Sequence, residues 1–285
     1  MIKRPCLLIF GHGYTANAFA DYIRNLDWEI FGTTRNSQNA DLLIKKGVKP
    51  LMWSDGSKIK SVINRADYIL HSIPPTEIGD PVYKRFSKAI MSRSTNLSWF
   101  GYLSTTSVYG NHDGKWVDEN IPVNPSSNRG LLRVKAENNW SSIKDLPLHI
   151  FRLAGIYGPN RSPLDKIRSG KAQLISKPGQ FFSRIHVEDI ARVLGASIEM
   201  PNHGSVYNVC DDMPAAPDEV LDYAAKLLNY PDLPKVAFEE AELSPMAKSF
   251  YSENKRVKNE RIKSELKITL KYPNFEIGLN ALAGK

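Results

Sequence analysis

The sequence predicts an α/β fold, with a doubly wound parallel sheet and a smaller C-terminal α+β region that covers one edge of it. Short apolar runs alternate with helical patterns through the first half of the chain, which is typical of parallel strands connected by crossover helices. The first run, residues 7–10, leads directly into a glycine turn and a helix. We therefore expect one domain at residues 1–155 and a covering region at residues 156–285.

The glycine turn follows the pattern G-x-G-x-x-A between a strand and a helix. Gly11 suits a tight turn, Gly13 lets a backbone approach a diphosphate, and Ala16 lets the helix pack close to the strand. The free N–H groups at the start of such a helix attract anions. The pattern predicts a Rossmann-like dinucleotide site; the alternative is a tight turn in an α/β protein that binds no nucleotide. The predicted cofactor-binding residues of this turn are Gly11, Gly13, Tyr14, Thr15 and Ala16.

The end of the second strand, at residues 28–35, favours NADP over NAD as the cofactor. NAD-binding folds carry an Asp or Glu about 20 residues after the glycines, where it holds the ribose 2′-hydroxyl. This strand ends in Thr34 and Arg35 with no acidic residue. A guanidinium pairs with a 2′-phosphate that a carboxylate would repel. The alternative is that Arg35 is an exposed loop residue.

A helix near residues 37–46 and a third strand at 48–53 come next. Asp55 follows that strand, where it either contacts an adenine or caps the next helix. A fourth strand begins at Asp67, and its exit lies at the carboxyl edge of the sheet, where ligands bind in such folds. The predicted cofactor-binding residues of this exit are Ser72, Ile73 and Pro74. A helix is expected at 83–91.

The fifth strand, at residues 99–103, runs into a segment rich in hydroxyl side chains at 104–107. Such hydroxyls can orient a carbonyl or an alcohol, or they can form a plain serine- and threonine-rich turn. Further elements are expected as a helix at 129–142, a strand at 148–153, a short strand and helix start within 182–191, and a strand at 205–209. The strands at 148–153 and 205–209 are expected to return to the main sheet.

Composition excludes several classes of function. The net charge is +8, and eight Lys or Arg stand against three Asp or Glu between Lys248 and Lys271. No nucleic-acid recognition motif accompanies this charge, so we interpret it as a solvated helix face. No apolar run is long enough to cross a bilayer, and the six histidines show no metal-ligand spacing. We expect a cytoplasmic protein with no metal, no nucleic-acid partner and no membrane partner, in which Cys6 and Cys210 are packed free thiols.

The order of these motifs resembles the extended and atypical short-chain dehydrogenase/reductase superfamily, in its NAD-dependent epimerase/dehydratase branch. The resemblance covers nearly the whole chain. It implies an NAD(P) cofactor and a small carbonyl or alcohol substrate, with sugar-nucleotide-like molecules among the candidates. The segments that carry it, besides the glycine turn, are residues 103–110, 152–159, 184–191 and 254–279.

The resemblance also implies that Thr105 holds the substrate oxygen, and that a Tyr and a Lys four residues apart transfer the proton. The corresponding positions here hold Arg129 and Arg133, and no tyrosine lies between Tyr109 and Tyr157. An arginine stays protonated and cannot act as the acid or base. The two arginines either clamp an anionic substrate or form a solvated basic helix face.

Three hypotheses follow. The first is an oxidoreductase or epimerase-like enzyme with a non-standard acid or base, either Tyr109 or a residue from the late segment, and its predicted catalytic residues are Thr105 and Tyr109. The second is an NADP-binding sensor or regulatory protein without turnover, and the third is a small-molecule binding protein with a vestigial nucleotide cleft. The predicted substrate residues are Tyr157, Arg184 and His186. The oligomeric state is expected to be a monomer or a homodimer.

Overall fold

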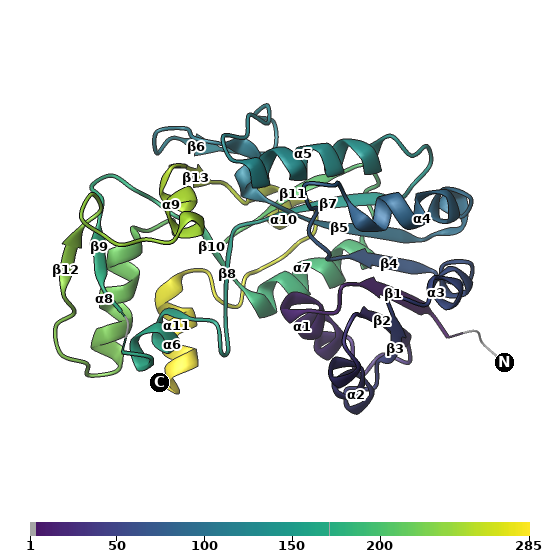
Figure 1. The fold of residues 1–285 in the computed structure, drawn as a ribbon, viewed down its shortest axis with the longest axis horizontal. Helices are drawn as coiled ribbons and strands as arrows, with labels where there is room; N and C mark the ends of the chain where they lie inside the picture. The colour runs from purple at the N-terminus through teal and green to yellow at the C-terminus, as the bar shows by residue number, and fades with distance from the viewer. Residues whose placement is uncertain (1–3, 171) are drawn as a thin grey trace.

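The computed structural model describes residues 4–170 and 172–285, and its centre is a seven-stranded, wholly parallel sheet (Figure 1). The strand order is β11-β7-β5-β4-β1-β2-β3. This confirms the predicted fold class. The strands are β1 (Cys6–Phe10), β2 (Glu29–Thr34), β3 (Lys49–Met52), β4 (Tyr68–His71), β5 (Trp99–Thr105), β7 (Leu148–Leu153) and β11 (Val206–Val209).

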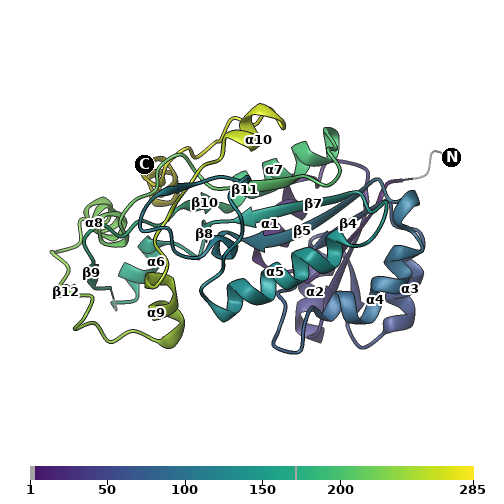
Figure 2. The same cartoon turned by 90° about the horizontal axis from the view of Figure 1, so that it is seen from above.

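Every residue of β1 is buried, because helices cover both faces of the sheet. Leu7 and Ile9 pack in one core, whereas Leu8 and Phe10 pack in the other, as the alternation of side chains along a strand requires. The helices lie in two layers, one on each face (Figures 1 and 2). The first layer contains α1 (Tyr14–Tyr22), α2 (Ser37–Lys45) and α7 (Val187–Glu199), and the second contains α3 (Gly56–Ile63), α4 (Pro81–Met91) and α5 (Asn128–Ser141).

The order of the strands reverses next to β1, which pairs with β2 on one side and with β4 on the other. Loops that leave the carboxyl ends of β1 and β4 therefore turn away in opposite directions and leave a crevice between them. The glycine turn leaves β1 at this point, and Ser72, Ile73 and Pro74 leave β4 beside it. The fold thus brings both predicted cofactor segments to one place.

The covering region consists of short elements around a separate core built on Leu164, Leu174, Val220 and Phe275. Three two-stranded parallel sheets connect segments far apart in the sequence. These pairs are β8 (Gly155–Tyr157) with β10 (Arg184–His186), β9 (Leu174–Ser176) with β12 (Lys235–Ala237), and β6 (Trp116–Val117) with β13 (Arg256–Val257). The helices are α6 (Pro163–Arg168), α8 (Pro217–Leu227), α9 (Pro245–Tyr251), α10 (Glu260–Ser264) and α11 (Phe275–Ala283), and the 3-10 turns of the chain are η1 (Ser94–Asn96) and η2 (Thr106–Tyr109).

The basic segment between Lys248 and Lys271 is not the single solvated helix face that the sequence analysis expects. It contains the end of α9, the strand β13 and the short helix α10. Val257 and Ile262 are fully buried within it, and even Lys255 is only 8% exposed. The charge therefore belongs to a segment that packs against the rest of the protein.

Within residues 4–170 and 172–285, no helix is both long and apolar enough to cross a membrane. The same residues contain no cluster of three or more His, Cys, Asp or Glu that could hold a metal ion. Cys6 and Cys210 are both buried, and neither forms a disulfide within the described part of the chain.

Candidate functional site

A cleft of about 1690 Å³ lies at the carboxyl edge of the sheet, between the sheet and the covering region. The ends of β1, β2, β4 and β5 form one side of it, and segments from α6, β10 and α9 form the other. The predicted site residues that line the cleft are Gly11, Gly13, Tyr14, Thr15, Thr34, Arg35, Ser72, Ile73, Pro74, Thr105, Tyr157 and Arg184. The predicted residues that do not line it are Ala16, Asp55, Tyr109 and His186.

The glycine turn forms the floor of the cleft. Gly11 has φ +81°, and a Cβ there would lie 2.6 Å from Cγ1 of Ile73, so only glycine fits. A Cβ at Gly13 would meet no atom within 4 Å. Gly13 is also the N-cap of α1, and no side chain caps this nine-residue helix. Its first N–H groups are thus left for an external acceptor, which gives the cleft a positively polarised end.

The end of β2 places Thr34 and Arg35 in the cleft wall. Thr33 ties β2 to the glycine turn, because its Oγ1 accepts a hydrogen bond from the Gly11 N–H at 2.8 Å. Arg35 is exposed and, among the described residues, forms no salt bridge. Its guanidinium is therefore available to an anionic ligand.

Asp55 is the N-cap of α3, where its Oδ1 accepts a hydrogen bond from the Lys58 N–H at 3.0 Å. That backbone bond is the largest of the causes that lower the pKa of Asp55 to about 2. Of the two roles that the sequence left open, the capping role is therefore present. Ala16 is fully buried between α1 and the sheet, in keeping with a role in close packing rather than in ligand contact.

Thr105 lies at the end of β5 and lines the cleft. Its Oγ1 accepts the Ser107 N–H at 3.3 Å and caps η2, so the serine- and threonine-rich turn exists as well. The hydroxyls on either side are engaged with α5: Ser104 donates to Glu137, and Ser107 accepts from Arg129. Thr105 therefore lies between two hydroxyls that are already bonded.

Tyr109 does not reach the cleft, and we do not retain it as a proton donor. It is fully buried, and its hydroxyl donates to Oδ1 of Asn208 at 2.8 Å and accepts from Nη1 of Arg152 at 3.0 Å. Burial also raises the pKa of this hydroxyl above its ordinary value. The 3-10 turn η2 directs Tyr109 back toward the sheet, where Arg152 also pairs with the buried Glu137 at 2.8 Å.

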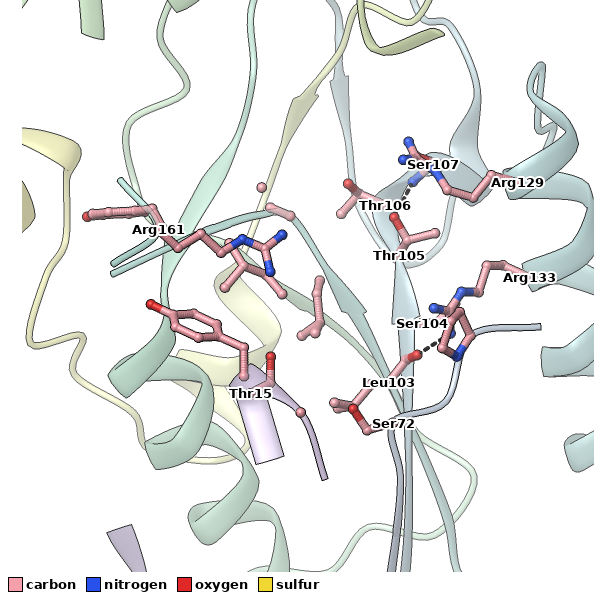
Figure 3. Close-up of a pocket in the computed structure, with 18 of the residues that line it drawn as sticks. Thr15, Ser72, Leu103, Ser104, Thr105, Thr106, Ser107, Arg129, Arg133 and Arg161 are labelled. Carbon is pink, nitrogen blue, oxygen red and sulfur yellow. Dashed lines mark hydrogen bonds between the residues drawn. The ribbon is translucent and has the colours of Figure 1, made fainter. Parts of the chain in front are cut away.

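Arg129 and Arg133 both face the cleft, so the solvated helix face that the sequence also allowed does not apply to them (Figure 3). Arg129 donates to the Ser107 hydroxyl at 3.1 Å, and Arg133 donates to the carbonyl of Leu103 and to the Tyr102 hydroxyl. Lys135, on the same helix, is exposed and lies outside the cleft. The helix thus presents two guanidinium groups, one turn apart, to the end of β5.

The sequence analysis missed a buried ion pair in the cleft wall, Lys255 with Glu253. Nζ of Lys255 lies 2.7 Å from Oε2 of Glu253 and donates to the carbonyl of Gly110 at 2.9 Å. Burial lowers the pKa of Lys255, although Glu253 opposes this shift. Residues 251–259 alternate between buried and more exposed positions, which places both charged side chains on the inward face, but the residue types alone do not show this alternation.

The three predicted substrate residues lie in the covering region, but only two of them line the cleft. Tyr157 and Arg184 line it, and Nη1 of Arg184 donates to the carbonyls of Phe182 and Ala215. His186 instead caps α7 by accepting the Glu188 N–H at 3.3 Å, and it packs against the ring of Tyr157. Burial lowers the pKa of His186 to about 4, so this imidazole is neutral near pH 7.

The comparisons with known proteins agree with this geometry. No protein-family model matches the chain. Protein YeeZ of Escherichia coli K12 is 23% identical over 278 residues, which cover 93% of this chain and 96% of YeeZ. The dTDP-glucose 4,6-dehydratase of Bacillus anthracis, solved in complex with NAD, superposes with a TM-score of 0.77 at 18% identity, covering 98% of this chain and 96% of the enzyme.

A much closer solved structure is that of a conserved protein of unknown function from Silicibacter pomeroyi. It is 49% identical to this chain, with a TM-score of 0.91 and 98% of each chain covered. The more distant structural neighbours are NAD-dependent epimerase/dehydratase-family proteins. The chain therefore belongs to the same family as the conserved protein of Silicibacter pomeroyi, and it shares the Rossmann-like fold of the NAD-dependent epimerases and dehydratases.

Proposed function

We propose that the protein binds NADP(H) in this cleft and acts as an epimerase-, dehydratase- or reductase-like enzyme on a small carbonyl or alcohol substrate. The observation that carries the proposal is the glycine turn. A Cβ at residue 11 would collide with Ile73, so glycine is required there. A Cβ at residue 13 would meet no atom within 4 Å, and Gly13 is the N-cap of α1, which has no side-chain cap. A diphosphate fits such an arrangement because it accepts the uncapped N–H groups.

The choice of NADP over NAD rests on Arg35, which follows β2 and has no carboxylate partner among the described residues. In the proposed complex, Gly13, Thr15 and the start of α1 hold the diphosphate, and Thr34 and Arg35 hold the ribose 2′-phosphate. Ser72, Ile73 and Pro74 would contact the cofactor from the side of β4. When bound, the cofactor supplies or accepts a hydride.

Hydride transfer to a carbonyl also requires a proton at the oxygen, and we assign that proton to Lys255 rather than to Tyr109. Two of the three N–H bonds of the Lys255 ammonium are used by Glu253 and Gly110, which leaves one for a substrate oxygen. Burial makes the ammonium a better acid by lowering its pKa. Thr105 would orient the same oxygen, as the resemblance implies.

Calorimetric titration with NADPH and NADH tests the cofactor, and the variant Gly13→Val tests its place. Because the added Cβ meets no protein atom within 4 Å, we expect little change in the thermal unfolding curve and loss of NADPH binding. Retention of binding would contradict the proposed position of the diphosphate. The variant Gly47→Ala, in an exposed turn outside the cleft, is a control for NADPH binding; its φ of +76° strains the new side chain, so only its nucleotide affinity is compared.

Turnover is tested by following nicotinamide absorbance across a panel of small carbonyls and alcohols. We expect Lys255→Met to lose turnover while it keeps its affinity for NADPH. The control Lys258→Met removes an exposed lysine three residues further along the chain. Tight NADPH binding with no turnover by any member of the panel would favour the second candidate, a sensor or regulatory protein. The position of Tyr109 outside the cleft supports that candidate.

A further inference from the structure

The arginine pair of α5, Arg129 and Arg133, occupies the part of the cleft next to the end of β5. Arg129 is anchored at Ser107 and Arg133 at Leu103, so the two guanidinium groups bracket Thr105 along the chain. Figure 3 shows both side chains reaching from the helix toward these residues, with Arg161 on the opposite side of the cleft. Two cations are thus fixed on either side of the residue expected to contact a substrate oxygen.

The guanidinium of Arg129 is held in place but is not fully paired. It lies over the ring of Phe250 at 4.2 Å, and Nη2 donates to Ser107. Its Nε is buried and has no hydrogen-bond partner among the described residues. A buried donor without an acceptor costs free energy unless a ligand supplies one. Burial accordingly lowers the pKa of Arg129.

The charges around the pair do not balance. The acidic neighbour is Glu253, and its carboxylate already accepts from Lys255 and from the Ser127 hydroxyl. Neither Arg129 nor Arg133 forms a salt bridge with any described residue. The part of the wall that Arg129, Arg133, Glu253 and Lys255 form therefore carries three cations against one anion, and a partly desolvated excess of positive charge favours an anionic ligand.

We propose that Arg129 and Arg133 bind an oxyanion group of the substrate, a carboxylate or a phosphate, while its reacting carbonyl or hydroxyl lies against Thr105. This inference rests on the proposed function and narrows its substrate class to small anionic molecules. A guanidinium suits the role because its N–H groups form a planar fork that matches two oxygens of a carboxylate or phosphate. The anchoring bonds at Ser107 and Leu103 fix the direction of each fork before the ligand arrives.

The test is calorimetric titration of the full chain with inorganic phosphate and with malonate, each with and without saturating NADPH. The variants Arg129→Met and Arg133→Met each remove one cation from the cleft. The matched control Lys135→Met removes one cation from the exposed side of the same helix. We expect each arginine variant to weaken binding of the preferred anion about tenfold or more, which is the effect of losing a charge-assisted hydrogen bond, and the control to change it less than twofold.

The probe that binds identifies the group: phosphate binding indicates a phosphate ester and malonate binding a carboxylic acid. Equal affinities in the wild type and both arginine variants would overturn the inference, as would a wild type that binds neither probe. NADPH titration of the same variants should give the wild-type affinity, which shows that they fold. If NADPH fails to bind the wild type but the anions bind through the arginines, the proposed function fails and the inference stands.

A second measurement needs no variant. In crystals of the wild type soaked with selenate, we expect an anomalous peak within hydrogen-bond distance of both Arg129 and Arg133. Selenate bound only at other places would overturn the inference. Arg129→Lys adds a finer test, because lysine keeps the charge but loses the fork and the Nε donor. We expect Arg129→Lys to lower the affinity for the preferred anion less than Arg129→Met does.

Discussion

Replacing Arg35 by alanine removes the one feature at the end of β2 that favours NADP. Arg35 is exposed and has no salt bridge within the described chain, so its removal breaks no contact that stabilises the fold. A charge-assisted hydrogen bond to a phosphate contributes roughly 1.5–3 kcal/mol, and exposure to solvent places this one near the lower end. We therefore expect the affinity for NADPH to fall about tenfold to thirtyfold, and the affinity for NADH to stay within twofold.

The assay is paired calorimetric titration with NADPH and NADH at two ionic strengths. The wild-type preference for NADPH should shrink at higher salt, because an exposed ion pair is screened. Arg35→Asp should reverse the preference, since a carboxylate repels a 2′-phosphate and accepts from a 2′-hydroxyl. A wild type that prefers NADH, or an Arg35→Ala variant that loses both nucleotides equally, would refute the reasoning.

Three further predictions concern stability. Gly11→Ala should lower the thermal midpoint by several degrees, because φ is +81° and the new Cβ would lie 2.6 Å from Ile73. Burial lowers the pKa of His149 to about 4, against about 6.5 in the unfolded chain. Its contribution to the free energy of unfolding is therefore fully present above pH 6.5 and falls by about 3 kcal/mol as the pH drops toward 4. His149→Gln should reduce this dependence of the unfolding free energy on pH, as measured by urea unfolding. Glu137→Gln should cost about 3–5 kcal/mol in urea unfolding, since it leaves the buried Arg152 unpaired.

Each of these predictions has its own control. Gly47→Ala has nearly the same φ, +76°, but no atom near the new Cβ, so an equal loss at both glycines would exclude the contact with Ile73 as a cause. Parallel stability curves for the wild type and His149→Gln between pH 4 and 6.5 would contradict the assigned pKa. A double variant that also replaces Arg152 by methionine should recover part of the loss at Glu137.

The sequence predicts the sheet well because buried parallel strands leave a strong local signal. The strand expected at 148–153 has the bounds of β7, and the glycine turn lies between β1 and α1 as expected. The helices α6, α8 and α11 were not predicted. Their apolar residues share one core with Tyr157, Leu174 and Leu233, so their positions depend on contacts distant in sequence.

The candidate site was harder to predict for the same reason. Whether Tyr109 faces the cleft is decided by its bond to Asn208, which lies 99 residues away in sequence. Lys255 belongs to a basic segment whose composition is typical of a solvated surface, and distant contacts, such as the pairing of β13 with β6 and the bond from Lys255 to Gly110, place that segment in the cleft wall. The roles of Arg129 and Arg133 depend on which face of α5 meets β5. The residue types of this helix do not predict that face.

The placement of β11 and α7 in the central layers has a consequence for synthesis on the ribosome. β11 pairs with β7, and α7 packs on the same face of the sheet as α1, although both follow most of the site in the sequence. Until Val209 has left the exit tunnel, β7 lacks its outer partner strand, and the apolar sheet face under α7 is only partly covered. The half of the chain that carries the glycine turn therefore does not complete its fold before β11 is made, and chaperone contact is expected to persist until β11 docks.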